Sequence, residues 1–283
     1  MRIPSKTQLF IDGLKKNAGN GNRPLFLDET GAISARWQNL TLSSVFQPIY
    51  KSNELTKSFA YEAFVRCQDA EGNSIGITDL FLKPEDQDQI TGLDRLCRTI
   101  HLLNFTLQDI PHALLFLNVN EGLISAVDDN HGAAFRKVID ALGFSSNRIV
   151  IELPVSLIKD KKRLHFVLQN YRLNSLEVAI NIDSINDLQG MTERANIHYI
   201  KIARQLLQPG KDITSELDLI AQLSNEANII LTKNAVKAPY LLDPRILLQG
   251  DAYGATSNFK AQVEVDSSFD YSTQEDFSLH VGG

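Results

Sequence analysis

Cysteine is scarce in this sequence, and long hydrophobic stretches are absent from it. The 283 residues include 2 cysteines, Cys67 and Cys97, which form neither a disulfide framework nor the spacing of a metal site. Such sparing use of cysteine is typical of a reducing cytoplasm. No apolar run reaches the length that spans a membrane, and the first residues lack the pattern of a secretory signal. We therefore expect a cytoplasmic protein without a membrane span.

An excess of positive charge is also lacking. The chain carries 28 Lys and Arg residues against 34 Asp and Glu residues, which gives a formal net charge of -6. This balance argues against direct binding of nucleic acid, although it leaves room for a local basic site that holds phosphates. Apolar residues make up 43% of the chain and charged residues 22%, which is the profile of a globular protein with a sizeable core.

Short apolar runs alternate along the chain with segments that have helical periodicity. Nearly continuous apolar strands separated by helices indicate parallel strands that are covered on both faces. The number of runs favours a closed (β/α)8 TIM-like barrel of the α/β class over an open doubly wound sheet. The runs occupy residues 44–50, 59–66, 114–120, 149–153, 178–182, 199–202, 228–232 and 246–250.

The link between the first two runs is too short for a parallel crossover. Only the segment KSNELTKS separates them, whereas a parallel connection needs about a dozen residues or more and usually contains a helix. The sequence therefore predicts a barrel whose first strand is antiparallel to the second.

The two ends of the chain differ in composition from the middle. Residues 1–40 are expected to form an N-terminal extension with one short amphipathic helix and a small hairpin within residues 24–37. Residues 41–254 would form the barrel. Residues 255–283 are rich in serine and acidic residues, so this C-terminal tail is expected to be partly disordered or to lie loosely on the barrel.

Polar residues stand near the carboxyl ends of several predicted strands. Glu62 lies in the middle of SFAYEAFVRC, and burial of a carboxylate without a partner is unfavourable. Each such residue could be a hydrogen-bonded structural group. Their convergence on the face where barrel enzymes build active sites favours a shared site instead. The set is Glu62, Asn118, Glu152, Asn181, Lys201 and Gln249.

These strands resemble those of a known family, the EAL domain. The fragments FQPIY, YEAFVR, FLNVN, VIEL, AINID, YIKI and LLQGDAYG follow the order that they have in that family, from about Val45 to Gly254. The resemblance implies a (β/α)8 barrel with an antiparallel first strand. It also implies hydrolysis of the bacterial second messenger cyclic di-GMP to linear pGpG with Mg2+ or Mn2+.

The resemblance carries over residue by residue. Arg66 would hold a ligand phosphate, since a guanidinium is a permanently charged fork of donors. Lys201 would orient water or neutralise phosphate charge. The implied cyclic di-GMP site consists of Gln47, Glu62, Phe64, Arg66, Asp94, Asn118, Lys201, Lys237 and Gln249. The family's metal-ligand positions fall on Glu62, Asn118, Glu152, Asn181 and Asn234.

Several of the family's acidic residues are missing at these positions. Asn181 and Asn234 stand where the family has carboxylates, and Lys237 adds a positive charge where the family has a glutamate. Asp183 could replace the lost aspartate only with a shift in register. Two-metal hydrolysis needs several anionic ligands. We therefore expect no catalytic residues and no resident cofactor, with Mg2+ or Mn2+ involved only if residual activity exists.

Two functions from different classes remain open. The first is a non-catalytic EAL-like regulator of bacterial cyclic di-GMP signalling that binds cyclic di-GMP, a protein partner, or both. The alternative is a protein–protein interaction regulator that has lost nucleotide binding. A weaker alternative is a residual metal-dependent cyclic di-GMP phosphodiesterase. A homodimer is compatible with each of these readings.

Overall fold

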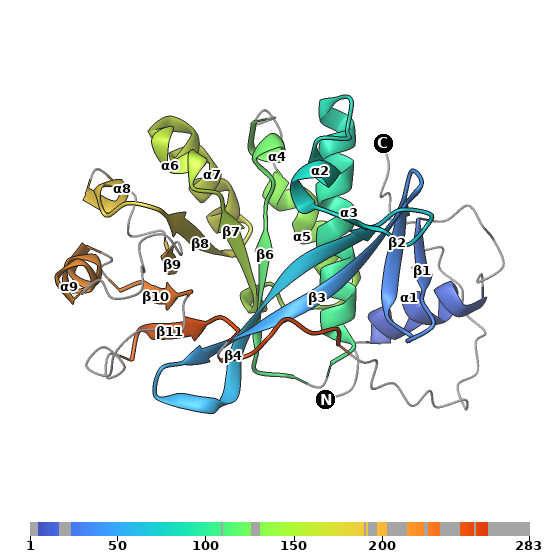
Figure 1. Ribbon diagram of the computed structural model, residues 1–283, viewed down its shortest axis with the longest axis horizontal. Coiled ribbons are helices and arrows are strands. Elements are labelled where there is room, and N and C mark those ends of the chain that lie inside the picture. The colour runs from blue at the N-terminus through green and yellow to red at the C-terminus, as the bar shows by residue number, and fades with distance from the viewer. Residues whose placement is uncertain are drawn as a thin grey trace.

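A computed structural model gives the fold of the chain (Figure 1). It describes residues 5–16, 24–108, 110–125, 131–189, 191, 197–202, 214–223, 226–232, 244–251 and 253–259. Asn234 and Lys237 of the predicted site lie outside the described residues. No helix within the described ranges is long and apolar enough to cross a membrane.

Strands of the described chain close into a (β/α)8 barrel, as predicted. Each strand from β6 to β11 is parallel to its neighbours in the series, and β4 is parallel to β6. Strand β3 is antiparallel to both β4 and β11 and closes the ring, which confirms the antiparallel first strand. The barrel strands are β3 (Leu40–Lys51), β4 (Glu54–Gln68), β6 (Leu114–Asn118), β7 (Ile149–Leu153), β8 (Glu177–Ile182), β9 (Tyr199–Ile202), β10 (Asn228–Leu231) and β11 (Ile246–Gln249).

Helices cover the outside of this barrel (Figure 1). Two of the long helices begin with an aspartate cap: Asp86 accepts from the backbone N–H of Gln89, and Asp160 from that of Arg163. The long helices are α3 (Gln87–Thr106), α5 (His131–Ala141), α7 (Lys161–Leu173) and α9 (Thr214–Leu223). Shorter elements are α2 (Ile77–Phe81), α4 (Glu121–Ser125), α6 (Ser156–Lys159), α8 (Asn186–Gln189), the 3-10 turn Ser146–Arg148 and β5 (Ser74–Ile75), which pairs with the end of β4.

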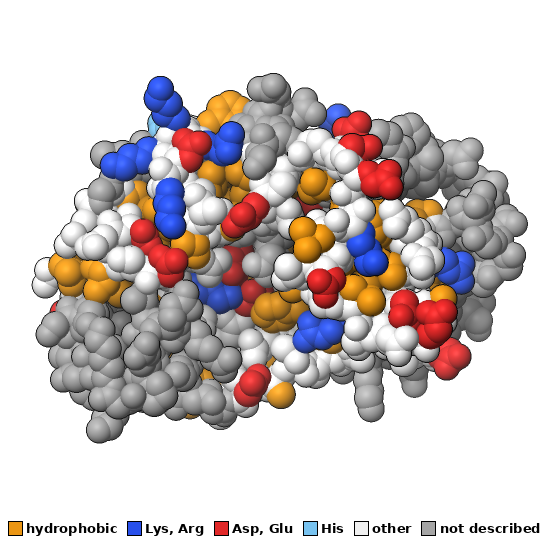
Figure 2. Space-filling model, turned by 45° about the horizontal axis from the view of Figure 1, so that its top comes forward, with side chains coloured by type: hydrophobic (Ala, Val, Ile, Leu, Met, Phe, Trp, Pro, Cys, Tyr) orange, Lys and Arg blue, Asp and Glu red, His pale blue; other side chains and the backbone are white. Residues whose placement is uncertain are grey.

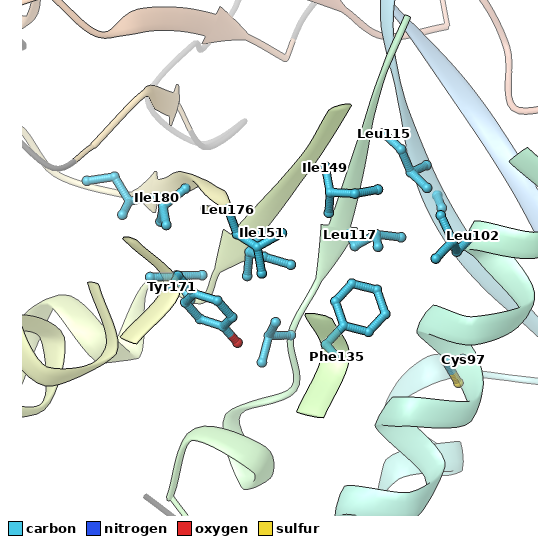
Figure 3. Close-up of a cluster of buried hydrophobic side chains, with 14 of the residues drawn as sticks. Cys97, Leu102, Leu115, Leu117, Phe135, Ile149, Ile151, Tyr171, Leu176 and Ile180 are labelled. Atoms are coloured by element: carbon cyan, nitrogen blue, oxygen red, sulfur yellow. The ribbon is translucent and has the colours of Figure 1, made fainter. Parts of the chain in front are cut away.

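Alternation along the strands separates two apolar layers. Outward residues such as Leu117 and Ile151 point toward the helices, where Figure 3 shows them near Phe135 and Tyr171. Inward residues at the amino-terminal half of the strands fill the barrel interior and include Phe116, Val150, Ala179, Tyr199, Ile230 and Leu247. Because side chains alternate with a period of two, the residue two positions after each inward apolar residue also faces the interior.

The N-terminal extension packs on the barrel in its described parts. Strands β1 (Leu25–Leu27) and β2 (Ile33–Trp37) form the predicted hairpin, and β2 continues the sheet by pairing with the start of β3. The buried side chain of Asn104 on α3 bonds both the N–H and the C=O of Ile33, at 2.8 and 2.7 Å. Helix α1 (Ser5–Lys16) is tied down by Thr7, whose hydroxyl donates to the Leu142 carbonyl at 2.7 Å.

Candidate functional site

The polar residues that the sequence singles out meet inside the barrel. Each lies two residues closer to the carboxyl end of its strand than a residue of the apolar interior layer. Glu62 follows Ala60 on β4, Asn118 follows Phe116 on β6, and Lys201 follows Tyr199 on β9. The same two-residue spacing relates Glu152, Asn181 and Gln249 to the interior residues Val150, Ala179 and Leu247. Hydrogen bonds connect all six side chains, so their predicted convergence is found in the structure.

Glu62 is buried at the centre of this cluster and accepts several hydrogen bonds. The amide nitrogen of Asn118 donates to its Oε1 at 2.9 Å. Its Oε2 accepts from the ammonium of Lys201 at 2.6 Å and from the amide nitrogen of Gln249. The side chain is 2% exposed. Its charge is therefore satisfied by protein groups, which is how a carboxylate becomes tolerable in an interior.

Glu152 is the second buried carboxylate of the cluster. The Lys201 ammonium lies 2.9 Å from its Oε1 and 3.2 Å from its Oε2, and Asn181 donates to Oε1 at 2.9 Å. Lys201 thus bridges Glu62 and Glu152. We name Glu62, Glu152 and Lys201 the central ionic cluster.

The central ionic cluster has more negative than positive charge. With both carboxylates ionised, Glu62 and Glu152 face the single ammonium of Lys201, which leaves one net negative charge among these three groups. Burial, and next the charge of Glu62, raise the pKa of Glu152 despite the nearby ammonium. Burial alone would lower the pKa of Lys201, but the two carboxylates outweigh it and raise the pKa, so the lysine stays protonated.

A pocket of about 360 Å³ opens above the cluster. Its lining includes Gln47, Glu62, Phe64, Asn181, Lys201 and Gln249. The Oε1 atom of Gln249 is buried and has no hydrogen-bond partner within the described chain. A buried acceptor of this kind is suited to a ligand that carries N–H or O–H donors. Figure 2 shows acidic and basic side chains close to one another over this face of the molecule.

Three of the predicted ligand-binding residues lie outside the pocket lining: Asn118, whose amide donates to Glu62, and also Arg66 and Asp94. Arg66 is exposed near the carboxyl end of β4 and donates to the carbonyl of Val65 at 3.1 Å. Asp94 is buried in α3, where it pairs with Arg98 at 2.6 Å and accepts from the backbone N–H of Asn120 at 2.9 Å. Ligand contact by Arg66 and Asp94 stays a prediction, and so does the ligand role of Lys237.

Sequence reasoning did not single out Asp251, which also lines the pocket. Its carboxylate accepts from the Gln47 side chain at 3.1 Å. A signal was present, because Asp251 belongs to the fragment LLQGDAYG that carries part of the family resemblance. Arg98 had no comparable signal, since a buried arginine on a helix looks in the sequence like any other charged helix residue.

These features define an (β/α)8 barrel with an antiparallel first strand and a charged pocket at the carboxyl ends of its strands. The EAL domain family model matches residues 31–233, and the chain belongs to this family. No curated protein sequence matches the chain.

Several solved structures share this fold at low sequence identity. The FimX EAL domain from Pseudomonas aeruginosa bound to c-di-GMP has 17% identity and a TM-score of 0.58, covering 77% of this chain and 92% of that one. EAL enzyme Bd1971, bound to cAMP and cyclic-di-GMP, has 11% identity and a TM-score of 0.62, with 91% and 68% coverage. Klebsiella pneumoniae BlrP1, in a manganese/cy-diGMP complex, has 15% identity and a TM-score of 0.58, with 86% and 64% coverage.

The described residues do not fit a two-metal centre. No group of three or more His, Cys, Asp or Glu side chains in the described part of the chain is placed to hold a metal, so Asp183 does not join Glu62 and Glu152 as a third ligand. Asn118 and Asn181 turn their amide nitrogens, which cannot bind a cation, toward these carboxylates. Both carboxylates are already bonded to the Lys201 ammonium.

Proposed function

We propose that this chain is a non-catalytic EAL regulator that binds cyclic di-GMP at the mouth of its barrel and acts on a protein partner. The observation that carries the loss of catalysis is the side chain of Asn181, at a position where the family has a carboxylate. Its amide nitrogen donates to Glu152 at 2.9 Å, so this position supplies no anionic ligand for a metal pair.

Ligand binding is supported by the groups that remain at the pocket. The aromatic ring of Phe64 gives a face on which a purine base could stack. The unpartnered Oε1 of Gln249 suits a base edge that carries N–H donors. The exposed guanidinium of Arg66, on the same strand end as Phe64, suits a phosphate. FimX and Bd1971 are EAL proteins that have been solved with this nucleotide.

Isothermal titration of the purified protein with cyclic di-GMP in EDTA tests this binding. We expect saturable heat without added metal, because none of the groups above needs one. Arg66→Ala should weaken binding by roughly tenfold to a hundredfold, since a charge-assisted hydrogen bond contributes about 1.5–3 kcal/mol. Arg163→Ala on α7 is the matched control, and it should leave the affinity unchanged. Equal losses in both variants would contradict a phosphate contact at Arg66.

Catalysis is tested separately by incubation with cyclic di-GMP and Mn2+. We expect no pGpG by chromatography, because among the described residues Glu62 and Glu152 have no third acidic side chain beside them to complete a metal site. Production of pGpG that disappears in Glu62→Gln would show that the chain is a hydrolase and would overturn the proposal.

The excess negative charge of the central ionic cluster favours a second candidate, an interaction regulator without nucleotide binding. A phosphate near Glu62 and Glu152 meets repulsion that Lys201 only partly offsets. Absence of heat and of a thermal shift with cyclic di-GMP, together with specific recovery of a partner from the source bacterium, would select this candidate.

A further inference from the structure

The segment that follows β11 completes one edge of the barrel. Strand β3 pairs with β4 along its whole length on one side, but its other edge is shared between β2, at Leu40–Leu42, and β11, at Ile49–Lys51. Between these two pairings, the backbone of Ser257 pairs with that of Phe46. The Phe46 N–H donates to the Ser257 carbonyl at 2.9 Å, and the Ser257 N–H donates to the Phe46 carbonyl at 3.0 Å. The start of the C-terminal tail thus fills the seam between β2 and β11. We name Asp251 and residues 253–259 the seam segment.

Phe259 anchors the far end of the seam segment. Its ring stacks on Phe46 with 4.1 Å between the ring centroids and meets Tyr61 edge-on at 5.1 Å. Phe105 of α3 lies 6.4 Å away on the same cluster. Aromatic contacts of this kind add to the free energy gained by burying the ring itself. Residues 255–259 therefore contact the barrel wall, whereas the rest of the predicted C-terminal tail, residues 260–283, lies outside the described residues.

The near end of the seam segment holds a residue of the pocket. The Nε2 of Gln47 donates to the Asp251 carboxylate at 3.1 Å and to the Gly254 carbonyl at 3.4 Å. Both partners are acceptors only, so the nitrogen of this amide must face them and the oxygen must face elsewhere. Gly254 packs so closely on Pro48 that a Cβ atom there would collide with the proline ring. The distance between Gln47 and the segment therefore depends on this close backbone contact.

We propose that Ser257 and Phe259 are positioning residues for the ligand pocket. They bind the seam segment to β3, and the segment in turn holds the amide of Gln47 with its Oε1 as the end available to a ligand donor. Gln249, whose buried Oε1 has no hydrogen-bond partner among the described residues, lines the same pocket, so the paired strands β3 and β11 each contribute an amide oxygen to the site. This pair suits the N–H donors of a guanine edge rather than a phosphate.

A double-variant cycle on the full-length protein tests the coupling, measured as the dissociation constant for cyclic di-GMP by titration calorimetry. Gln47→Ala and Phe259→Ala should each weaken binding by roughly fivefold, the value of one lost hydrogen bond. The double variant should be no weaker than either single one, because Phe259 acts through Gln47. Phe259→Leu, whose side chain still fills the space between Phe46, Tyr61 and Phe105, should recover most of the affinity. Phe166→Ala on the exposed face of α7 is the matched control and should bind as wild type.

Independent losses that multiply in the double variant, or an unchanged affinity in Phe259→Ala, would overturn the coupling. Because nucleotide binding is itself the proposed function, a second readout separates the two ideas. The side-chain amide signals of Gln47 in NMR spectra, identified by their loss in Gln47→Ala, should shift in Phe259→Ala but not in Phe166→Ala. If wild type binds no cyclic di-GMP, the proposed function fails, whereas unshifted Gln47 signals in Phe259→Ala would reject the positioning role.

Discussion

Two groups of buried charges in this barrel differ in balance and in position. Asp94 and Arg98 form a one-to-one ion pair on α3. Both side chains are 2% exposed, and the Arg98 Nη2 lies 2.6 Å from the Asp94 Oδ2. The central ionic cluster lies inside the barrel and sets the two carboxylates of Glu62 and Glu152 against the ammonium of Lys201. The carboxylates of both groups are almost completely removed from water, so burial of the acids alone does not distinguish the groups.

The balanced pair behaves as a structural element. Asp94 accepts from the backbone N–H of Asn120. This bond fixes the loop that follows Asn118, whose side chain donates to Glu62. The guanidinium of Arg98 lies over the ring of Phe135, with 4.5 Å from its carbon to the ring centroid. The central ionic cluster instead borders a pocket and keeps one uncompensated negative charge. An imbalance of this kind costs stability, and sites that serve a ligand are where such a cost is retained.

The largest expected effect is the loss of the arginine from the balanced pair. Arg98→Met leaves the Asp94 carboxylate buried, with the Asn120 N–H as its one remaining partner in the described part of the chain, so the free energy of unfolding should fall by about 3–5 kcal/mol. Urea denaturation followed by circular dichroism measures this. Arg163→Met breaks the exposed pair with Asp160 and should cost less than about 1 kcal/mol. A similar cost for both variants would remove the structural role from Asp94 and Arg98.

Removal of the lysine from the central ionic cluster should cost less. In Lys201→Met the carboxylate of Glu62 keeps the donors Asn118 and Gln249, and the two carboxylates can share a proton, so we expect a loss of about 3 kcal/mol near neutral pH. Because the folded variant binds protons more tightly than the unfolded chain, the deficit relative to wild type should shrink as the pH is lowered. A deficit that grows toward acid pH would contradict the shared-proton explanation.

A third buried group, His101, has no charged partner among the described residues, and its effect on stability depends on pH. Its ring nitrogen lies 2.7 Å from the Ser44 hydroxyl, and burial lowers its pKa to about 3. Between that value and the usual pKa near 6.5 the unfolded chain binds the proton and the folded protein does not, so this contribution to stability falls as pH falls. We expect a loss of about 2 kcal/mol between roughly pH 6.5 and pH 5.

The variant His101→Gln isolates this contribution, because an amide can still bond Ser44 but does not titrate in that range. Denaturation curves at several pH values should show a smaller acid loss for His101→Gln than for wild type. Parallel profiles would mean that His101 does not titrate differently in the two states.

The smallest expected effect comes from balancing the central ionic cluster. Burial and the charge of Glu62 raise the pKa of Glu152, so its ionised form costs stability as the pH rises above its ordinary value of 4.5. Glu152→Gln removes that charge and keeps an acceptor for Lys201, so stability near pH 7.5 should change by less than about 1 kcal/mol or rise slightly. Asp94→Asn, the same change in the balanced pair, should lose about 3 kcal/mol. Equal losses in the two variants would show that the charge imbalance does not affect the free energy of unfolding.

Several features of the site follow from local patterns. Glu62, Glu152 and Lys201 lie on predicted barrel strands near their carboxyl ends, and the rule that barrel sites form at this end predicted that they meet. The antiparallel first strand follows from the short link KSNELTKS. Both inferences need only spacing along the chain, which is why they could be made before the structure.

Other features required the three-dimensional arrangement. The partners of buried Asp94 are one such feature, because they are the Arg98 guanidinium and the backbone N–H of Asn120, which is 26 positions away. The serine-rich, acidic composition of the tail gave no sign that Phe259 stacks on Phe46, because the receiving slot is assembled from β3, β4 and α3.

By itself the amino-acid order determined the barrel, its unusual first strand and the set of polar side chains that face its interior, because each depends on periodicity or on the length of a connection. Which charges pair with which, and which groups remain without a partner, was decided only by tertiary structure. Electrostatic and hydrogen-bond energies depend on distances of a few ångströms between residues far apart in the chain, and those distances exist only once the barrel has closed.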